Sequence, residues 1–186
     1  MPDLADAPEI FRRAVVSLNA VRSRPEIRFE PIPAPQRLAP WTYAWGLEIP
    51  GTGHASATGR LVLLHDPDGQ EAWEGTLRLV GFVRAELDAE FAGDPLLPAV
   101  GWSWLVDALS GVGAEHIALG GTVTQTSSAR FGTLTGPERA DDIELRASWT
   151  PIGDRLAAHG EAFCELMAAA VGLPPVGVVA LGKRLD

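Results

Sequence analysis

Residues 41–49, with the sequence WTYAWGLEI, alternate strictly between large apolar side chains and small or polar ones. Because successive side chains of a β-strand point to opposite faces, this period of two predicts a strand with one face on a core. Similar alternation occurs over residues 75–87 and 143–149, while the apolar run 60–65 favours a more central strand. Short connections between these segments predict an antiparallel sheet with one polar face and one covered face.

Each strand pattern predicts which side chains face the core. The residues expected to face inward are Trp41, Tyr43, Trp45, Leu47, Ile49, Leu77, Leu79, Val83, Ala85, Leu87, Ile117, Leu119, Val123, Ile143, Leu145, Ala147 and Trp149. Gly81, in the middle of its strand, suggests a bulge or a bend. Residues 65–69 are expected to form a tight turn, and residues 128–141 a long loop.

Three segments have helical spacing. The N-terminal helix is expected over about residues 8–23, and the last has an inner stripe from Leu156 to Val171. The middle helix should begin at Pro98, since proline is welcome at the first helical position. Its predicted inner stripe is Trp102, Leu105, Val106 and Leu109, with Trp102 in the core. Trp104 lies about 160° around this helix from Trp102 and should therefore face elsewhere.

These elements predict a two-layer α+β fold with an antiparallel sheet of five to six strands and helices on one face. The expected order is helix, three to four strands, helix, two strands, helix. The length of 186 residues suits a single domain over residues 1–186. A proline-rich crossing over residues 31–40 and an apolar tail over residues 173–186 complete this organisation.

Composition narrows the functional classes. The net charge of −9, from 24 acidic and 15 basic residues, argues against a dedicated nucleic-acid-binding protein. The sequence contains no signal peptide and no stretch approaching about 20 apolar residues, so we expect no membrane association and a cytoplasmic location. A single cysteine, Cys164, excludes a disulfide framework and any multi-cysteine metal site.

No catalytic or metal-binding pattern is present in the sequence. The four histidines have no spacing typical of a metal pair. Cys164 and His159 are five residues apart, about 140° around a helix, which excludes a thiolate–imidazole pair within that helix. Ser103 lies inside a helix, where its hydroxyl can bond a preceding carbonyl. We therefore assign no catalytic residue, metal site or cofactor.

Four segments together resemble one protein family. They are residues 32–40 (IPAPQRLAP), 59–73 (GRLVLLHDPDGQEAW), 94–104 (DPLLPAVGWSW) and 147–151 (ASWTP). The chain resembles, over nearly its whole length, the actinobacterial family of unknown function 3000. The resemblance implies no activity, cofactor or catalytic residue.

Two functional hypotheses follow. The first is a non-enzymatic binding or adaptor protein that acts through an exposed sheet face or edge. In that hypothesis, self-association or a protein partner would use apolar surface formed by Trp104, Val176, Val178, Val179 and Leu181. The second is a small-ligand-binding protein or enzyme with a pocket between sheet and helices. That pocket would be formed by His65, Arg84, His116 and Arg146, which could converge in space.

Overall fold

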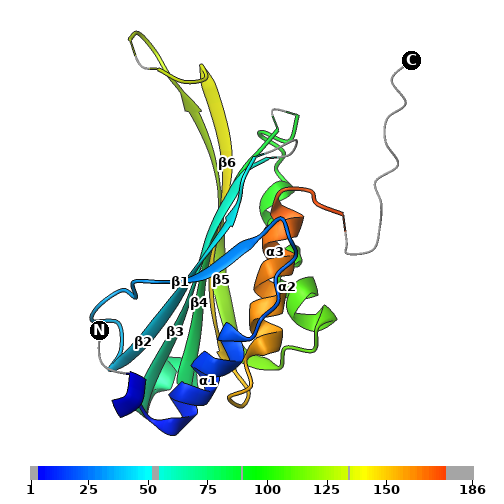
Figure 1. Cartoon of the computed structure of the whole chain (residues 1–186). Coiled ribbons are helices and arrows are strands. Elements are labelled where there is room, and N and C mark those ends of the chain that lie inside the picture. Colours follow the sequence, from blue (N-terminus) through cyan, green and yellow to red (C-terminus); the bar gives the residue numbers. More distant parts are fainter. Residues whose placement is uncertain (1–3, 52–54, 89, 134, 175–186) are drawn as a thin grey trace.

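The computed structural model describes residues 4–51, 55–88, 90–133 and 135–174. The fold predicted from the sequence is confirmed: six strands form one antiparallel sheet in the order β1-β2-β3-β4-β6-β5, and helices cover one of its faces (Figure 1). The strands are β1 (Arg28–Ile32), β2 (Trp41–Ile49), β3 (Ala57–Gln70), β4 (Gly75–Glu86), β5 (His116–Ala129) and β6 (Arg139–Pro151).

In the described part of the chain, three α-helices lie over the inner face of the sheet (Figure 1). They are α1 (Glu9–Asn19), α2 (Leu97–Gly111) and α3 (Ala157–Ala170), with short 3-10 turns η1 (Leu4–Asp6) and η2 (Glu71–Trp73). The element order is the predicted one, although α1 ends at Asn19 rather than near residue 23. Helix α2 begins one residue before Pro98, so the proline occupies the first turn, where its missing N–H costs nothing.

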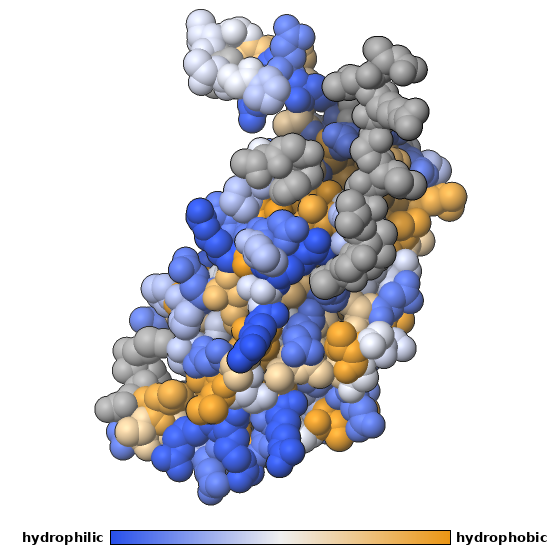
Figure 2. Space-filling view, turned by 45° about the vertical axis from the view of Figure 1, so that its right-hand side comes forward, coloured by the Kyte–Doolittle hydropathy of each residue, from blue (hydrophilic) through white to orange (hydrophobic). Residues whose placement is uncertain are grey.

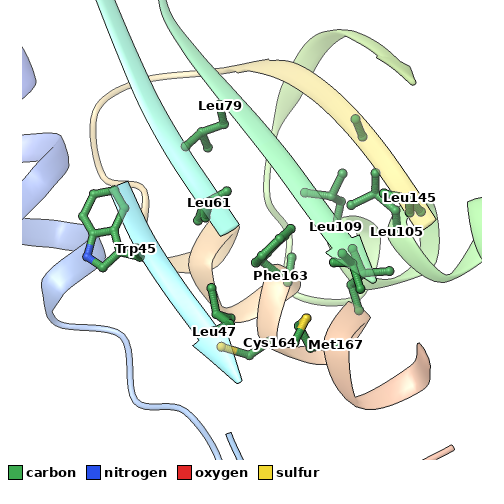
Figure 3. Packing of buried hydrophobic residues seen from close by; sticks show 14 of the residues in the cluster. Trp45, Leu47, Leu61, Leu79, Leu105, Leu109, Leu145, Phe163, Cys164 and Met167 are labelled. Carbon is green, nitrogen blue, oxygen red and sulfur yellow. The ribbon is translucent and has the colours of Figure 1, made fainter. Parts of the chain in front are cut away.

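The core forms between the inner sheet face and the helices (Figure 3). The predicted alternation of β2 is confirmed, because Trp45, Leu47 and Ile49 are buried in this core while Glu48 is exposed. The two fully buried tryptophans also satisfy their indole N–H groups. Trp45 Nε1 donates to Asn19 Oδ1 at 2.8 Å, and Trp149 Nε1 donates to His159 Nδ1 at 3.1 Å.

Two glycines in the sheet make room for helix α3. A Cβ added to Gly59 would lie 2.7 Å from Met167 Sδ, and one added to Gly81 would lie 2.7 Å from Phe163 Cε2. Figure 3 shows Phe163 and Met167 directed from α3 toward the strands. Of the bulge or bend predicted at Gly81, the bulge is absent, because Gly81 pairs with Leu61 in an unbroken register. The glycine permits close helix–sheet packing instead.

Strand β5 contains a bulge that the sequence pattern did not reveal. Ile117 pairs with Thr150 and Gly120 with Ser148, so β5 has one residue more than β6 between these two pairs. The extra residue places the β5 side chains that precede it on the opposite face of the sheet from the one that alternation predicts. Ile117, predicted to face the core, therefore lies on the outer face and is 39% exposed, whereas Leu119 and Val123 pack against the core as predicted.

Helix α2 is rotated relative to its predicted orientation. Its buried stripe is Leu97, Gly101, Leu105 and Leu109, at intervals of four residues. Trp102 is only half-buried, where it packs on the edge of the core, and Val106 is exposed, so the assignment of both to the buried stripe is wrong. Gly101 takes the central position because a Cβ there would lie 2.8 Å from Ile143 Cδ1.

The outer sheet face is not wholly polar. Ala44, Val62 and Leu64 are buried on it and form a small second cluster. The proline-rich segment crosses this face, and Ala34 and Ala39 pack onto the cluster. The segment is thus an extended cover for the outer face, which explains why β2, β3 and β4 carry apolar residues on both faces.

Both long hairpins differ from the predicted turns. Residues 65–69 belong to β3 and form an irregular stretch between the pairs His65–Leu77 and Gln70–Gly75. The chain reverses later, at η2, although Asp66 Oδ1 does accept a turn-like bond from the Asp68 N–H at 3.2 Å. The long loop predicted over residues 128–141 is shorter in the structure, because residues 128–129 belong to β5 and residues 139–141 to β6. Residues 130–133 and 135–138 belong to the loop between them, at the tip of a hairpin that projects beyond the helices (Figure 1).

Candidate functional site

A groove of about 1180 Å³ lies at the end of the sheet from which the β5–β6 hairpin projects. Its walls come from the segment after β4, the first turns of α2, the end of α3 and the start of β6. The side chains that give it apolar character are Leu87, Phe91, Leu97, Val100, Trp104 and Val171. Figure 2 shows hydrophobic surface exposed just below the projecting hairpin.

Local sequence chemistry positions the groove walls. Asp94 Oδ1 accepts the Leu96 N–H at 2.8 Å, which organises the turn that leads into α2. Leu97, Val100 and Trp104, at spacings of three and four residues, then lie on one flank of this helix. On the opposite wall α3 ends with Ala169, Ala170 and Val171, whose small side chains leave the groove open.

The rim of the groove is acidic. Glu86, Asp88, Asp94 and Asp141 all line it, and Arg139 is the one basic residue among the described lining residues. Arg139 is itself neutralised, because its Nε lies 2.8 Å from Asp141 Oδ2 and its Nη2 lies 3.1 Å from Asp141 Oδ1. Hydrogen bonds from Ser127 and Arg139 lower the pKa of Asp141. The remaining carboxylates give the groove a negative potential.

The four residues predicted to form a pocket do not come together. His65 is buried on the inner face, where its ring stacks on Phe11 and its Nδ1 lies 2.8 Å from Thr76 O. His116 begins β5, with its Nδ1 2.8 Å from Ala114 O. Neither histidine lines the groove.

Arg84 and Arg146 lie on the other side of the sheet. Both belong to the outer face, because their neighbours along each strand, Val83 and Ala85 in β4 and Leu145 and Ala147 in β6, face the core. Arg84 Nη2 contacts Asp142 Oδ2 at 2.8 Å, and the Arg146 guanidinium lies 5.3 Å from the Phe82 ring centroid. The prediction of a pocket from these four residues is therefore wrong: the sheet itself separates its members.

Of the residues predicted to form an interface, Trp104 alone lies in the described part of the chain. Trp104 is half-buried and lines the groove, facing away from Trp102, as the helix geometry predicted. Val176, Val178, Val179 and Leu181 lie outside the described residues, so an interface that includes them stays a prediction. Sequence reasoning missed the other groove residues. The only signal was Phe91, a large apolar residue in a breaker-rich segment.

The described residues contain no group of three or more His, Cys, Asp or Glu side chains that could hold a metal ion. Cys164 is buried, and burial raises the pKa of its thiol to about 12. Ser103 Oγ donates to Val100 O at 2.9 Å within α2, as expected for a structural serine. Nor does any described helix have the length and apolar character that a membrane crossing requires.

Comparison with known proteins agrees with the segment resemblance. A family model described as "Protein of unknown function (DUF3000)" matches residues 7–179. The chain belongs to this family. The match spans every strand and α-helix, the groove and the projecting hairpin. Searches among curated proteins and solved structures find no match. Membership of DUF3000 therefore brings no activity to this chain.

Proposed function

We propose that this DUF3000 protein is a non-catalytic binding protein whose groove takes an apolar, positively charged peptide segment of a partner protein. The observation that carries the proposal is the combination of an apolar floor, formed by residues such as Leu97, Val100 and Trp104, with a rim of carboxylates. An apolar segment flanked by lysine or arginine would satisfy both features at once.

Binding is favoured over catalysis by the groove's chemistry. The described residues that line it include no histidine, cysteine, serine or lysine, so none of them forms a nucleophile with a neighbouring base. The Asp141–Arg139 pair holds a carboxylate ionised, which is unsuited to general acid work near neutral pH. The second hypothesis, a small-ligand-binding protein or enzyme, would need a site other than the predicted pocket.

The size of the groove favours a peptide over a small molecule. Small-molecule pockets are usually about 300–1,000 Å³ and bury most of their ligand. The groove, at about 1180 Å³, exceeds that range and is bounded by separate elements rather than enclosed by one cluster. Peptide recognition by an apolar groove relies on a few large anchor side chains, for which Trp104 and Leu97 offer contact area.

The sheet face is a less suitable binding surface than first expected. The proline-rich segment covers its apolar cluster. Much of the rest carries ion pairs, including Arg28–Glu48, Arg84–Asp142 and Arg146–Glu144. A partner on this face would have to displace these ion pairs or leave them in place, and it would bury little apolar area. The groove therefore replaces the sheet face as the proposed binding site.

The test uses a reporter thiol in the groove of the full-length chain. Val100→Cys places it in the lining, and Val106→Cys places a matched one on the same helix outside the groove. Cys164, buried and with its thiol pKa raised to about 12, stays silent toward alkylating reagents. The probe is a synthetic amphipathic helix with leucines on one face and lysines on the other. A matched peptide has glutamate in place of each lysine.

We expect the lysine peptide to slow alkylation of the Val100→Cys variant and to leave the Val106→Cys variant unchanged. Added salt should weaken the protection, because the rim acts through charge. Protection by neither peptide, or equal protection by both, contradicts the proposal. If deleting residues 175–186 speeds alkylation at position 100 while the peptides have no effect, the groove is occupied by this segment of the same chain and not by a partner protein.

A further inference from the structure

Strand β5 forms an edge of the sheet along its whole length. It pairs with β6 on one side only, so within the described part of the chain its other side has no strand partner. Nine of its 14 residues are exposed. From Gly120 to Ala129 its register with β6 is unbroken, and this regular stretch presents free backbone N–H and C=O groups to solvent.

This edge lacks the features that protect sheet edges from pairing. Natural edge strands are usually short, charged, interrupted by proline or covered. Strand β1, at the opposite edge, follows this rule, with five residues that include Arg28, Glu30 and Pro31. Strand β5, HIALGGTVTQTSSA, contains no Asp, Glu, Lys, Arg or Pro. Its one irregularity is the bulge before Gly120, which leaves the following ten residues regular.

We propose that the β5 edge pairs with the β5 edge of a second copy of this chain, antiparallel and about a two-fold axis near Thr124. Directly opposite residues of an antiparallel pair share a face. Thr122, Thr124 and Thr126 alternate on the outer face, opposite Arg146, Glu144 and Asp142 of β6. A register centred on Thr124 places Thr124 opposite its equivalent and Thr122 opposite Thr126. Cross-strand threonine pairs of this kind are favourable.

The same register brings together apolar side chains that the single chain leaves exposed. Because the bulge adds one residue before Gly120, Ile117 lies six ladder positions from Thr124. The axis therefore places Ile117 of one copy opposite Arg130 of the other, next to Phe131. Ile117 is 39% exposed because of the bulge, and Phe131, in the projecting hairpin, is 81% exposed. On the inner side α2 lies over β5, with the half-buried Trp102 against Gly121 and Val106 one turn further along.

A second copy suits this edge better than an unrelated peptide. The chain carries a net charge of −9, so two copies repel each other over most of their surfaces. The β5 edge is the long exposed element from which charge is absent, and it therefore permits close approach of identical chains. The exposed apolar residues are also self-complementary about the axis, which an isologous interface requires and a single peptide would not explain.

The experiment measures the mass of the full-length chain in solution by light scattering, together with three variants. Thr124→Lys and Thr124→Glu each place two like charges opposite one another at the axis. Thr58→Lys is the matched control. Thr58 is exposed on the same outer face of the interior strand β3, and Glu48 lies opposite it as Glu144 lies opposite Thr124. Circular dichroism checks that each variant retains its fold.

We expect the unchanged chain and Thr58→Lys to have twice the 19.7 kDa mass of one chain. Thr124→Lys and Thr124→Glu should each be monomeric at the same concentration, and an equal mixture of the two should form dimers again because the opposed charges then attract. A monomeric unchanged chain overturns the proposal, as does a dimer that both Thr124 variants retain. This experiment does not test the groove, because neither Thr124 nor Thr58 lines it. Failure of the dimer proposal and failure of the groove proposal are therefore distinguishable.

Discussion

Among single residues, Cys164 has the clearest chemical consequence. It lies on α3, is 4% exposed, and desolvation together with Glu165 and Glu161 raises its thiol pKa to about 12. Because the thiolate is the reactive form, we expect no labelling by a disulfide reagent at pH 8 in the native protein and one equivalent after unfolding in guanidinium. Rapid labelling of the native chain at that pH would show that α3 opens locally.

His159 should make stability depend on pH. It is 2% exposed, and burial, with a smaller contribution from His116, lowers its pKa from 6.5 to about 4. The unfolded state therefore binds a proton at a higher pH than the folded state does. As pH falls from about 6.5 to about 4, the free energy of unfolding should decrease by roughly 3 kcal/mol from this residue, and below pH 4 its effect should level off.

Urea unfolding at a series of pH values measures this dependence, with His159→Asn as the comparison. Asparagine keeps an oxygen that can accept the Trp149 indole N–H, a bond of 3.1 Å in the native chain, but it does not titrate. Carboxylates such as Asp141, whose pKa is lowered, also reduce stability in acid and affect both proteins. The difference between the two curves isolates His159. Parallel curves between pH 6.5 and pH 4 would contradict the assignment.

At the scale of elements, the contact between α3 and the sheet depends on missing side chains. A Cβ at Gly81 would lie 2.7 Å from Phe163 Cε2 and 3.4 Å from Trp149 Cζ3, and both rings are fully buried. Gly81→Ala should therefore overpack the core and lower the free energy of unfolding by about 1–3 kcal/mol. Gly111→Ala is the control, since nothing lies within 4 Å of its added Cβ. Equal stability of both variants in urea would show that α3 shifts without cost.

The periodicity of single elements predicted most of the fold. Alternation in β2, β4 and β6 identified the core-facing residues, because side-chain direction in a regular strand depends only on local geometry. The errors occur where local periodicity does not determine the direction of a side chain. The bulge in β5 reversed Ile117, and the rotation of α2 was set by close packing of Gly101 on Ile143. Both depend on neighbours distant in the sequence.

The groove could not be predicted for the same reason. Its walls come from the chain around Leu87, Trp104, Asp141 and Val171, four places separated by tens of residues. Sequence reasoning identified Trp104 as turned away from Trp102 but could not identify what it faced. The predicted pocket failed because it joined residues of opposite faces: alternation in β4 and β6 already directs Arg84 and Arg146 outward, whereas His65 faces the core beside Phe11. Chemical plausibility alone does not place residues on one face.

For the molecule as a whole, the sheet extends further than the helices that cover it. The β5–β6 hairpin continues past α2 and α3 (Figure 1), and most of the side chains near its tip are exposed. Stability should therefore come from the two-layer body, where the sheet has helices over it. The projecting part adds backbone pairing but little buried apolar area, so its removal tests where the folding energy lies.

Replacing residues 130–138 with Asn-Gly provides that test. Ala129 pairs directly with Arg139, so a two-residue turn of this type can join them without changing the register. The shorter loop lowers the closure entropy by about 1 kcal/mol. Loss of the Arg130 N–H bond to Glu138 O, 2.8 Å long, costs about the same. We expect the free energy of unfolding in urea to change by less than about 1 kcal/mol. A larger loss would mean that the hairpin tip stabilises the body through contacts beyond its own strands.

The same replacement also removes Phe131, which is exposed in the single chain. A weaker dimer with an unchanged fold would show that this hairpin contributes little to folding and substantially to association.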